Sequence, residues 1–218
     1  MTKPIPLRAR ILARVMRAFF YLLYHQFAWT YDFVANSVSL GLWKKWISSV
    51  LPELKGPRIL ELGHGPGHLQ DMLIESGHNP FGLDASPQMS KLADRRLRNN
   101  YSQPNLINGY AQNIPFQKEI FHQVVATFPS EYIIDSSTLM EIKRVLIPGG
   151  TLIILPAAWI TGQSLLERSA AWLFQITGQS QSWDSRIQNP FSEAGFQTEI
   201  KRITHRSWSV FLILAKKT

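Results

Sequence analysis

The chain has 218 residues, of which 45% are hydrophobic and 17% charged, and this composition excludes a disordered polypeptide. The length fits one α/β domain with an appendage, and the absence of cysteine excludes disulfide bonds, thiolate zinc sites and a cysteine nucleophile. The net charge of +8 is unevenly distributed, because residues 1–58 carry +7 and residues 59–218 carry +1. The N-terminal quarter is therefore the basic part of the chain.

Residues 5–29 have the apolar spacing of an amphipathic helix. Apolar side chains cover one wide arc of this helix, and the opposite side carries Arg10, Arg14 and Arg17. Two interpretations stay open: the helix covers the core with its basic face in solvent, or it contacts an anionic membrane surface. We expect residues 1–50 to form a basic helical lid and residues 51–218 to form the main domain.

The lengths of the apolar runs indicate in which compartment the protein is expected. A bilayer span needs about 18–20 consecutive apolar residues, and the longest early run, residues 18–24, has seven. Arg14 and Arg17 lie too close to this run for a secretory signal. An organellar presequence is a minor alternative, since residues 1–31 carry four arginines and no acid. We predict a cytoplasmic protein, with peripheral membrane contact through residues 5–29 as the open question.

From residue 58 onward, short β-rich segments alternate with helical patterns, which is typical of a parallel sheet built from βαβ units. The predicted strands are residues 58–62, 80–84, 105–109, 121–127 and 151–155. The predicted helices between them are residues 67–77, 87–98 and 135–146. Pro148-Gly149-Gly150 is a turn signal that stops the last of these helices and leads into the fifth strand.

The C-terminal part of the chain departs from this alternation. Residues 163–176 have the spacing of a further amphipathic helix, which we place in an insertion over residues 162–182. Residues 196–203 and 207–215 then predict two strands separated by about three residues, which pair antiparallel at or near the sheet edge. The sequence thus predicts a seven-stranded α/β sheet with a terminal antiparallel hairpin.

A glycine-rich loop follows the first predicted strand. Gly63, Gly65 and Gly67 occupy alternate positions between that strand and the next helix. Glycine is needed where φ is positive or where a ligand approaches the backbone, and the N–H groups at a helix start attract negatively charged parts of a ligand. Three alternate glycines exceed what turn geometry alone requires, so the pattern predicts a ligand-binding loop.

The residues that flank the three glycines narrow the class of ligand that this loop could bind. The dinucleotide fingerprint needs a small residue where His68 stands, which counts against NAD or FAD as the ligand. No Lys-Ser or Lys-Thr follows the glycines, which excludes a Walker loop. Asp84 ends the second strand, where a carboxylate can accept hydrogen bonds from both ribose hydroxyls of a nucleoside held over the loop. Its alternative role is to cap the next helix, for which Ser86 before Pro87 is the better residue.

These residues resemble motif I and the following acidic position of the class I S-adenosylmethionine-dependent methyltransferases. The match begins with Glu61-Leu62-Gly63-His64-Gly65-Pro66-Gly67 and Asp84. Residues 109–116, Gly-Tyr-Ala-Gln-Asn-Ile-Pro-Phe, are similar to the family's Gly-Asp-Ala-x-x-Leu-Pro-Phe, and residues 121–125 to its Phe-Asp-x-Val-Val. Residues 141–150 are similar to the helix and turn before its fifth strand, so the resemblance covers residues 58–155.

A second, shorter resemblance concerns the N-terminal part. Tyr31-Asp32-Phe33, Ser39-Leu40-Gly41 and Lys45-Trp46 are similar to a segment of the ubiquinone/menaquinone C-methyltransferase group. The resemblance implies that the N-terminal helices form a lid over the methionine end of the cofactor, with Tyr31 lining the site.

The family resemblance implies a Rossmann-like methyltransferase sheet with an N-terminal helical extension, and S-adenosylmethionine as the cofactor. It implies that Glu61 helps to hold the methionine end, that Asp84 takes the ribose and that Thr127 contributes backbone near the methionine amino group. We expect no metal site. The expected cofactor-binding residues are Tyr31, Glu61, Gly63, His64, Gly65, Gly67, Asp84, Ala85, Ala111, Gln112 and Thr127.

Two positions depart from the family pattern. Tyr110 stands where the family usually has an aspartate that contacts the adenine amino group, which shifts the expected adenine contact to Ala111, Gln112 and main-chain groups. His122 replaces an aspartate of the fourth strand, where a structural role is expected.

The sequence predicts a small, apolar or lipid-like methyl acceptor such as a quinone precursor. Residues 127–130, Thr-Phe-Pro-Ser, lack the Asn/Asp-Pro-Pro-Tyr/Phe motif of enzymes that methylate exocyclic or amide nitrogens. The aromatic residues Trp159, Trp172 and Phe174 either line an acceptor pocket or pack on the sheet. A general base is needed only if the acceptor loses a proton, and no choice is justified among His64, His68, Glu131 and Tyr132.

Two alternatives stay open at this level. A sequence pI near 9.9 suggests an RNA methyltransferase, although the basic residues lie mainly at one end of the chain, which makes a nucleic-acid partner the weaker interpretation. The departures at Tyr110 and His122 leave room for a binding module that holds the cofactor without transferring its methyl group.

Overall fold

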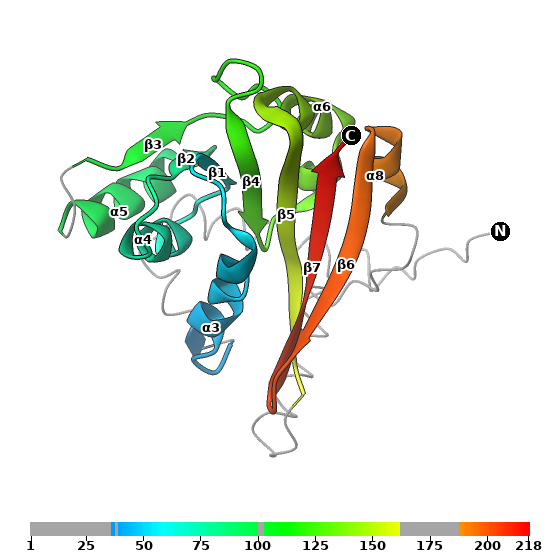
Figure 1. The fold of residues 1–218 in the computed structure, drawn as a ribbon. Coiled ribbons are helices and arrows are strands. Elements are labelled where there is room, and N and C mark those ends of the chain that lie inside the picture. Colours follow the sequence, from blue (N-terminus) through cyan, green and yellow to red (C-terminus); the bar gives the residue numbers. More distant parts are fainter. Residues whose placement is uncertain (1–35, 38, 100–102, 162–187) are drawn as a thin grey trace, which may run out of the picture.

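The computed structural model describes residues 36–37, 39–99, 103–161 and 188–218 (Figure 1). The predicted helices at 5–29 and 163–176, and Tyr31, lie outside these residues. In chain order the elements are α3 (Trp43–Ser48), the 3-10 helix η2 (Leu51–Glu53), β1 (Ile59–Leu62), α4 (His68–Glu75), β2 (Phe81–Asp84), α5 (Pro87–Arg98), β3 (Asn105–Asn108), β4 (Phe121–Thr127), the 3-10 helix η3 (Glu131–Ile134), α6 (Ser136–Val145), β5 (Leu146–Ile160), α8 (Gln188–Glu193), β6 (Phe196–Thr204) and β7 (Trp208–Lys217).

The strands form one seven-stranded sheet in the order β3-β2-β1-β4-β5-β7-β6. The five strands from β3 to β5 are parallel to their neighbours, whereas β7 runs antiparallel to both β5 and β6. The predicted α/β sheet and terminal hairpin are confirmed, and β6 is the edge strand of that hairpin (Figure 1).

Helices cover both faces of this sheet. All four residues of β1 are buried, as expected for a central parallel strand whose two faces are both covered. One apolar cluster joins α3 and α4 to one face through residues that include Trp46, Ile59, Leu69, Leu73 and Val125. The other cluster joins α6 and α8 to the opposite face through residues that include Leu62, Val124, Leu139, Ile142 and Phe191.

The described end of the predicted lid packs directly on the core. Trp46, Ile47 and Val50 are almost completely buried, and all three belong to the cluster that contains β1 and α4. Residues 43–50 are therefore part of the folded core. Among the described residues, no helix has both the length and the apolarity required to cross a bilayer.

Strand β5 is much longer than residues 151–155, the range predicted from the sequence. Pro156 lacks the N–H group that a strand interior needs, which predicts a strand end at Leu155. The register between β5 and β7 shifts between Ile154 and Ala157, so an irregularity accommodates the proline and pairing continues to Ile160 opposite Trp208. As a result, β5, β7 and β6 extend together beyond the end of β4 (Figure 1).

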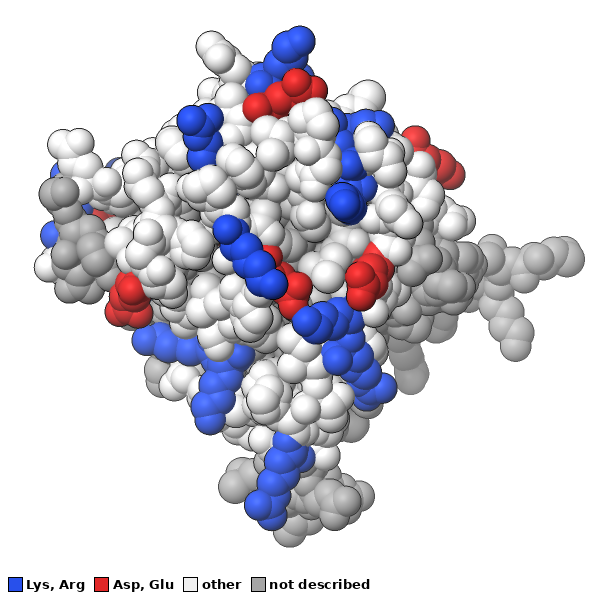
Figure 2. Space-filling view, in the orientation of Figure 1, with Lys and Arg blue, Asp and Glu red and all other residues white. Residues whose placement is uncertain are grey.

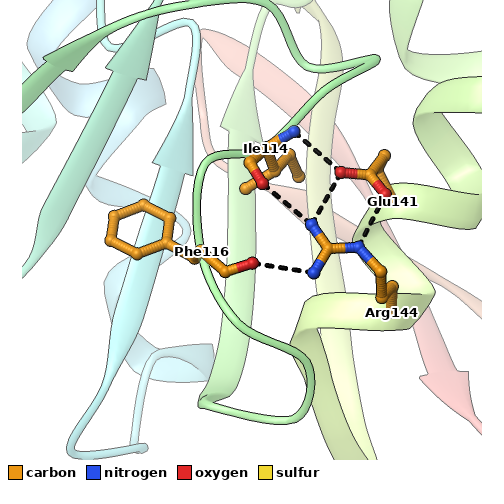
Figure 3. Close-up of polar contacts among 4 residues, drawn as sticks. All are labelled: Ile114, Phe116, Glu141 and Arg144. Carbon is orange, nitrogen blue, oxygen red and sulfur yellow. Dashed lines mark hydrogen bonds and ion pairs between the residues drawn. The ribbon is translucent and has the colours of Figure 1, made fainter.

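The loop between β3 and β4 is fixed to α6 by one charged network (Figure 3). The Glu141 carboxylate accepts a hydrogen bond from the Ile114 N–H at 2.8 Å and pairs with the Arg144 guanidinium at 2.6 Å. Arg144 also donates to the carbonyl oxygens of Ile114 and Phe116, at 2.8 and 2.7 Å. Because three backbone polar groups of this loop bond to one guanidinium and one carboxylate, the loop has a defined position.

We predict that Arg144→Leu lowers the free energy of unfolding by about 1–3 kcal/mol, because the partly buried carbonyls of Ile114 and Phe116 and the Glu141 carboxylate lose a charged hydrogen-bond donor. Arg98→Leu is the matched control, since Arg98 is 57% exposed and pairs with Asp94 across one helical turn. That exposed pair contributes less than about 0.5 kcal/mol. Urea denaturation measures both variants, and equal losses would contradict the anchoring role of Arg144.

Candidate functional site

A cavity of about 360 Å³ lies at the carboxyl ends of the parallel strands. The chain runs from β1 outward to β2 and β3 and then returns to β4 on the other side of β1, so β1 and β4 form the topological switch point at which such sheets bind ligands. The loops that follow β1, β2, β3 and β4 all contribute to its wall. The lining residues are Gly63, Gly65, Leu83, Asp84, Ala85, Ser86, Gly109, Tyr110, Ala111, Gln112, Thr127, Phe128, Pro129, Ser130 and Tyr132.

The three glycines of the loop after β1 all have positive φ but serve different purposes. A Cβ on Gly63 would lie 2.8 Å from the Tyr132 hydroxyl, whereas a Cβ on Gly65 would meet no protein atom within 4 Å. The backbone at Gly65 therefore faces open space in the cavity, where a ligand can approach it closely. A Cβ on Gly67 would lie 2.9 Å from the Ala93 Cβ, so this glycine allows α4 to pack against α5.

Asp84 connects the end of β2 to the glycine loop. Its Oδ2 atom accepts a hydrogen bond from the Gly65 N–H at 2.8 Å, and its Oδ1 atom accepts one from the Ser86 N–H at 2.7 Å. Ser86 caps α5, since its hydroxyl accepts from the Met89 N–H at 3.3 Å. Each carboxylate oxygen of Asp84 keeps a second acceptor position for hydroxyl donors in the cavity.

A second, smaller cavity of about 30 Å³ shares Gly63, Gly65 and Thr127 with the first. Its wall includes Glu61, which is 1% exposed and accepts a hydrogen bond from the Gln70 side-chain amide at 2.8 Å. Burial raises the pKa of Glu61 to about 8; the Gln70 hydrogen bond lowers that pKa, and the charge of Asp84 raises it. A pKa raised to about 8 favours the protonated form of Glu61 at pH 7 in the unliganded chain.

His64 is a packed residue of the loop. It is 3% exposed, its Nδ1 atom donates to the Gly65 carbonyl at 2.8 Å, and its Nε2 atom lies 3.5 Å from the Ser90 hydroxyl. Burial lowers the pKa of His64, against the opposing charge of Asp84. These contacts give His64 the role of supporting the glycine loop against α5.

Phe128 has an unusual backbone conformation directly after β4. Its φ of 48° lies in the left-handed region, which costs about 1–3 kcal/mol for a bulky residue. Its ring stacks on Trp43 of α3, with centroids 4.5 Å apart and planes at 23°. Phe128 lines the large cavity and Trp43 lines the small one. These two side chains thus form an aromatic wall, the name that we keep for Trp43 and Phe128 together.

The structure brings most of the residues expected from the sequence together. Seven of them line the large cavity: Gly63, Gly65, Asp84, Ala85, Ala111, Gln112 and Thr127. Glu61 and His64 line the small cavity, Gly67 lines neither, and Tyr31 lies outside the described residues. Sequence reasoning omitted Leu83, Ser86, Gly109, Tyr110 and Phe128 from the expected set, although each lies next to a strand end that it identified.

The comparisons with known proteins agree with this geometry. Residues 60–154 match the sequence family described as "Methyltransferase domain". Demethylmenaquinone methyltransferase of Chlorobaculum tepidum is 31% identical over 142 residues, which cover 61% of this chain and 57% of that protein. The chain thus spans little more than half the length of this curated relative.

Two solved structures share the fold. A candidate S-adenosyl-L-methionine-dependent methyltransferase from Methanococcus maripaludis superposes with a TM-score of 0.65 and 19% identity, covering 89% of this chain and 94% of that one. Phosphoethanolamine N-methyltransferase 2 of Haemonchus contortus, solved with S-adenosyl-L-methionine, gives a TM-score of 0.60 and 16% identity, covering 81% of this chain and 53% of that one. Residues 60–154 are therefore similar to a methyltransferase domain, and the described residues share the fold of these two solved structures.

Proposed function

We propose that this chain binds S-adenosylmethionine and transfers its methyl group to a small, apolar or lipid-like acceptor of the quinone-precursor kind. One observation carries the proposal: the Asp84 carboxylate is held at the cavity by the Gly65 N–H, next to open space over Gly65. This arrangement presents acceptor atoms for ribose hydroxyls beside a backbone that a nucleoside can approach.

The residues present fit such a cofactor. The cavity volume of about 360 Å³ lies within the range of about 300–1,000 Å³ that small-molecule sites occupy. From Asp84 at the ribose position, Tyr110, Ala111 and Gln112 lie on the side suited to the purine ring. Gly63 and Thr127 lie where the large cavity meets the small one, which is the side left for the methionine end.

The chain's own contribution is binding, alignment and exclusion of water. When bound, S-adenosylmethionine supplies a methyl group on a positively charged sulfur, so the protein need not supply a nucleophile of its own. Tyr132 extends over Gly63 and donates to the Leu62 carbonyl at 3.2 Å, which closes one side of the cavity near that end. His64 is engaged beneath the loop, so we do not assign it the role of a general base.

Two observations support an apolar or lipid-like acceptor. The curated relative from Chlorobaculum tepidum bears the name demethylmenaquinone methyltransferase, and menaquinone precursors are apolar. The basic excess in residues 1–58 suits contact with an anionic membrane surface, from which such an acceptor would come. In the upper and central part of the face drawn in Figure 2, Lys and Arg lie among Asp and Glu, a mixed pattern that suits a nucleic-acid backbone poorly, whereas the lower part shows Lys and Arg alone.

We predict that the chain transfers label from methyl-labelled S-adenosylmethionine to demethylmenaquinone dispersed in vesicles containing anionic lipid. The expected product partitions into organic solvent, and Asp84→Ala forms much less of it at a cofactor concentration near the wild-type dissociation constant. A parallel reaction with total RNA should leave the RNA unlabelled. Label in RNA would contradict the acceptor class, and cofactor binding with no labelled product from either acceptor would contradict methyl transfer itself.

Glu61 predicts a pH dependence of cofactor affinity. Its pKa of about 8 means that unliganded Glu61 keeps its proton below pH 8. A cationic methionine end beside it favours the carboxylate, so binding releases this proton and affinity rises with pH. The dissociation constant should fall by up to about tenfold per pH unit between pH 6 and 8 and then level off.

The matched control is Glu61→Gln, which has the same shape and cannot lose a proton. Calorimetric titration in buffers of different ionisation enthalpy should detect proton release for the wild type and much less for the variant. If both proteins show the same pH dependence and the same proton release, Glu61 is not the linked group.

A further inference from the structure

We propose that the aromatic wall of Trp43 and Phe128 recognises the positive charge on the sulfur of the bound cofactor and so makes the site favour S-adenosylmethionine over its neutral demethylated product. This inference rests on the proposed function and assigns the specificity of the same site to two aromatic side chains. Cofactor and product share every group except the transferred methyl and the positive charge that it places on the sulfur.

The position of the wall supports this role. Phe128 lines the large cavity and Trp43 lines the small one, and the two cavities share Gly63, Gly65 and Thr127. The rings are stacked at 4.5 Å, and both side chains are half-buried. The two rings therefore line adjoining cavities, and we infer that the sulfur of the cofactor lies beside them if the ribose is at Asp84. A cation within about 6 Å of an aromatic ring is attracted to its electron-rich face.

The backbone of Phe128 supports a role that requires an aromatic ring. Glycine or asparagine would adopt a φ of 48° with much less strain than phenylalanine does. Strained bulky residues persist mainly at ligand sites, where the side chain is needed in that place. The Phe128 N–H donates to the Leu155 carbonyl at 2.7 Å, which holds the strained residue at the end of β4.

Two acidic residues, Glu61 and Asp84, also lie near the two cavities. Unlike the aromatic wall, they do not distinguish the cofactor from its demethylated product. Glu61 lines the small cavity on the side left for the methionine end, and Asp84 already accepts two backbone hydrogen bonds at the ribose position. The methionine amino group is present in cofactor and product alike, so a carboxylate beside that group affects both ligands. The sulfur charge is present in the cofactor alone.

The test compares dissociation constants for S-adenosylmethionine and S-adenosylhomocysteine by calorimetry at pH 7. Phe128→Leu and Trp43→Leu remove one ring each and keep apolar bulk. Each should weaken binding of the cofactor by about 3- to 30-fold and leave binding of the product nearly unchanged. Phe128→Tyr and Trp43→Phe keep a ring and should keep most of the preference.

Phe116→Leu is the matched control, because Phe116 packs on Phe81 and Phe121 and lines neither cavity. It should leave the ratio of the two constants unchanged. Equal weakening of both ligands by Phe128→Leu would show a packing role and overturn the inference, as would a ratio that collapses in Glu61→Gln and not in the wall variants. If Phe128→Leu does not fold, Trp43→Leu decides by the same ratio. Failure of the wild type to bind either ligand would overturn the proposed function, and this inference with it.

Discussion

The hydrogen bond from the Gly65 N–H to the Asp84 carboxylate joins the two loops on which the site depends. A second bond, from the Gly63 N–H to the Leu83 carbonyl at 2.7 Å, runs parallel to it. Together they hold the loop after β1 against the end of β2, and both segments line the cavity. Because the first bond involves a charged acceptor in a half-buried position, it contributes more than a neutral hydrogen bond would. The cavity therefore has a defined floor before any ligand arrives.

The other walls are fixed by separate devices. The loop after β3 is held by Arg144 and Glu141 of α6, so its cavity-lining residues 110–112 depend on a network on the far side of the loop. The loop after β4 is held by the strained backbone of Phe128 and by its stack on Trp43. The loops after β3 and β4 are thus tied to different helices, α6 and α3, and the loop after β1 is tied to the end of β2.

Much of the fold was predictable because its signals are local. Alternating apolar segments gave the positions of the parallel strands to within a few residues, and the Ser86-Pro87 pair gave the start of α5. The length of β5 was not predictable, because Pro148-Gly149-Gly150 and Pro156 both indicate strand ends, whereas the strand runs from Leu146 to Ile160 through pairing with β4 and β7. The same distinction between local and tertiary signals applies to the residues of the site. Glycine spacing identified the loop and Asp84, whereas the left-handed backbone of Phe128 depends on tertiary packing that no local pattern encodes.

The central claim, that Asp84 and the loop at Gly65 hold a nucleoside cofactor, is tested most directly by calorimetric titration with S-adenosylmethionine. Asp84→Ala and Gly65→Leu should weaken binding by about 10- to 100-fold relative to the wild type. Their controls should not: Asp94→Ala removes an exposed carboxylate, and Gly77→Leu places a side chain in open space on an equally left-handed backbone. A wild type that does not bind, or controls that weaken binding as much as the site variants, would contradict the account.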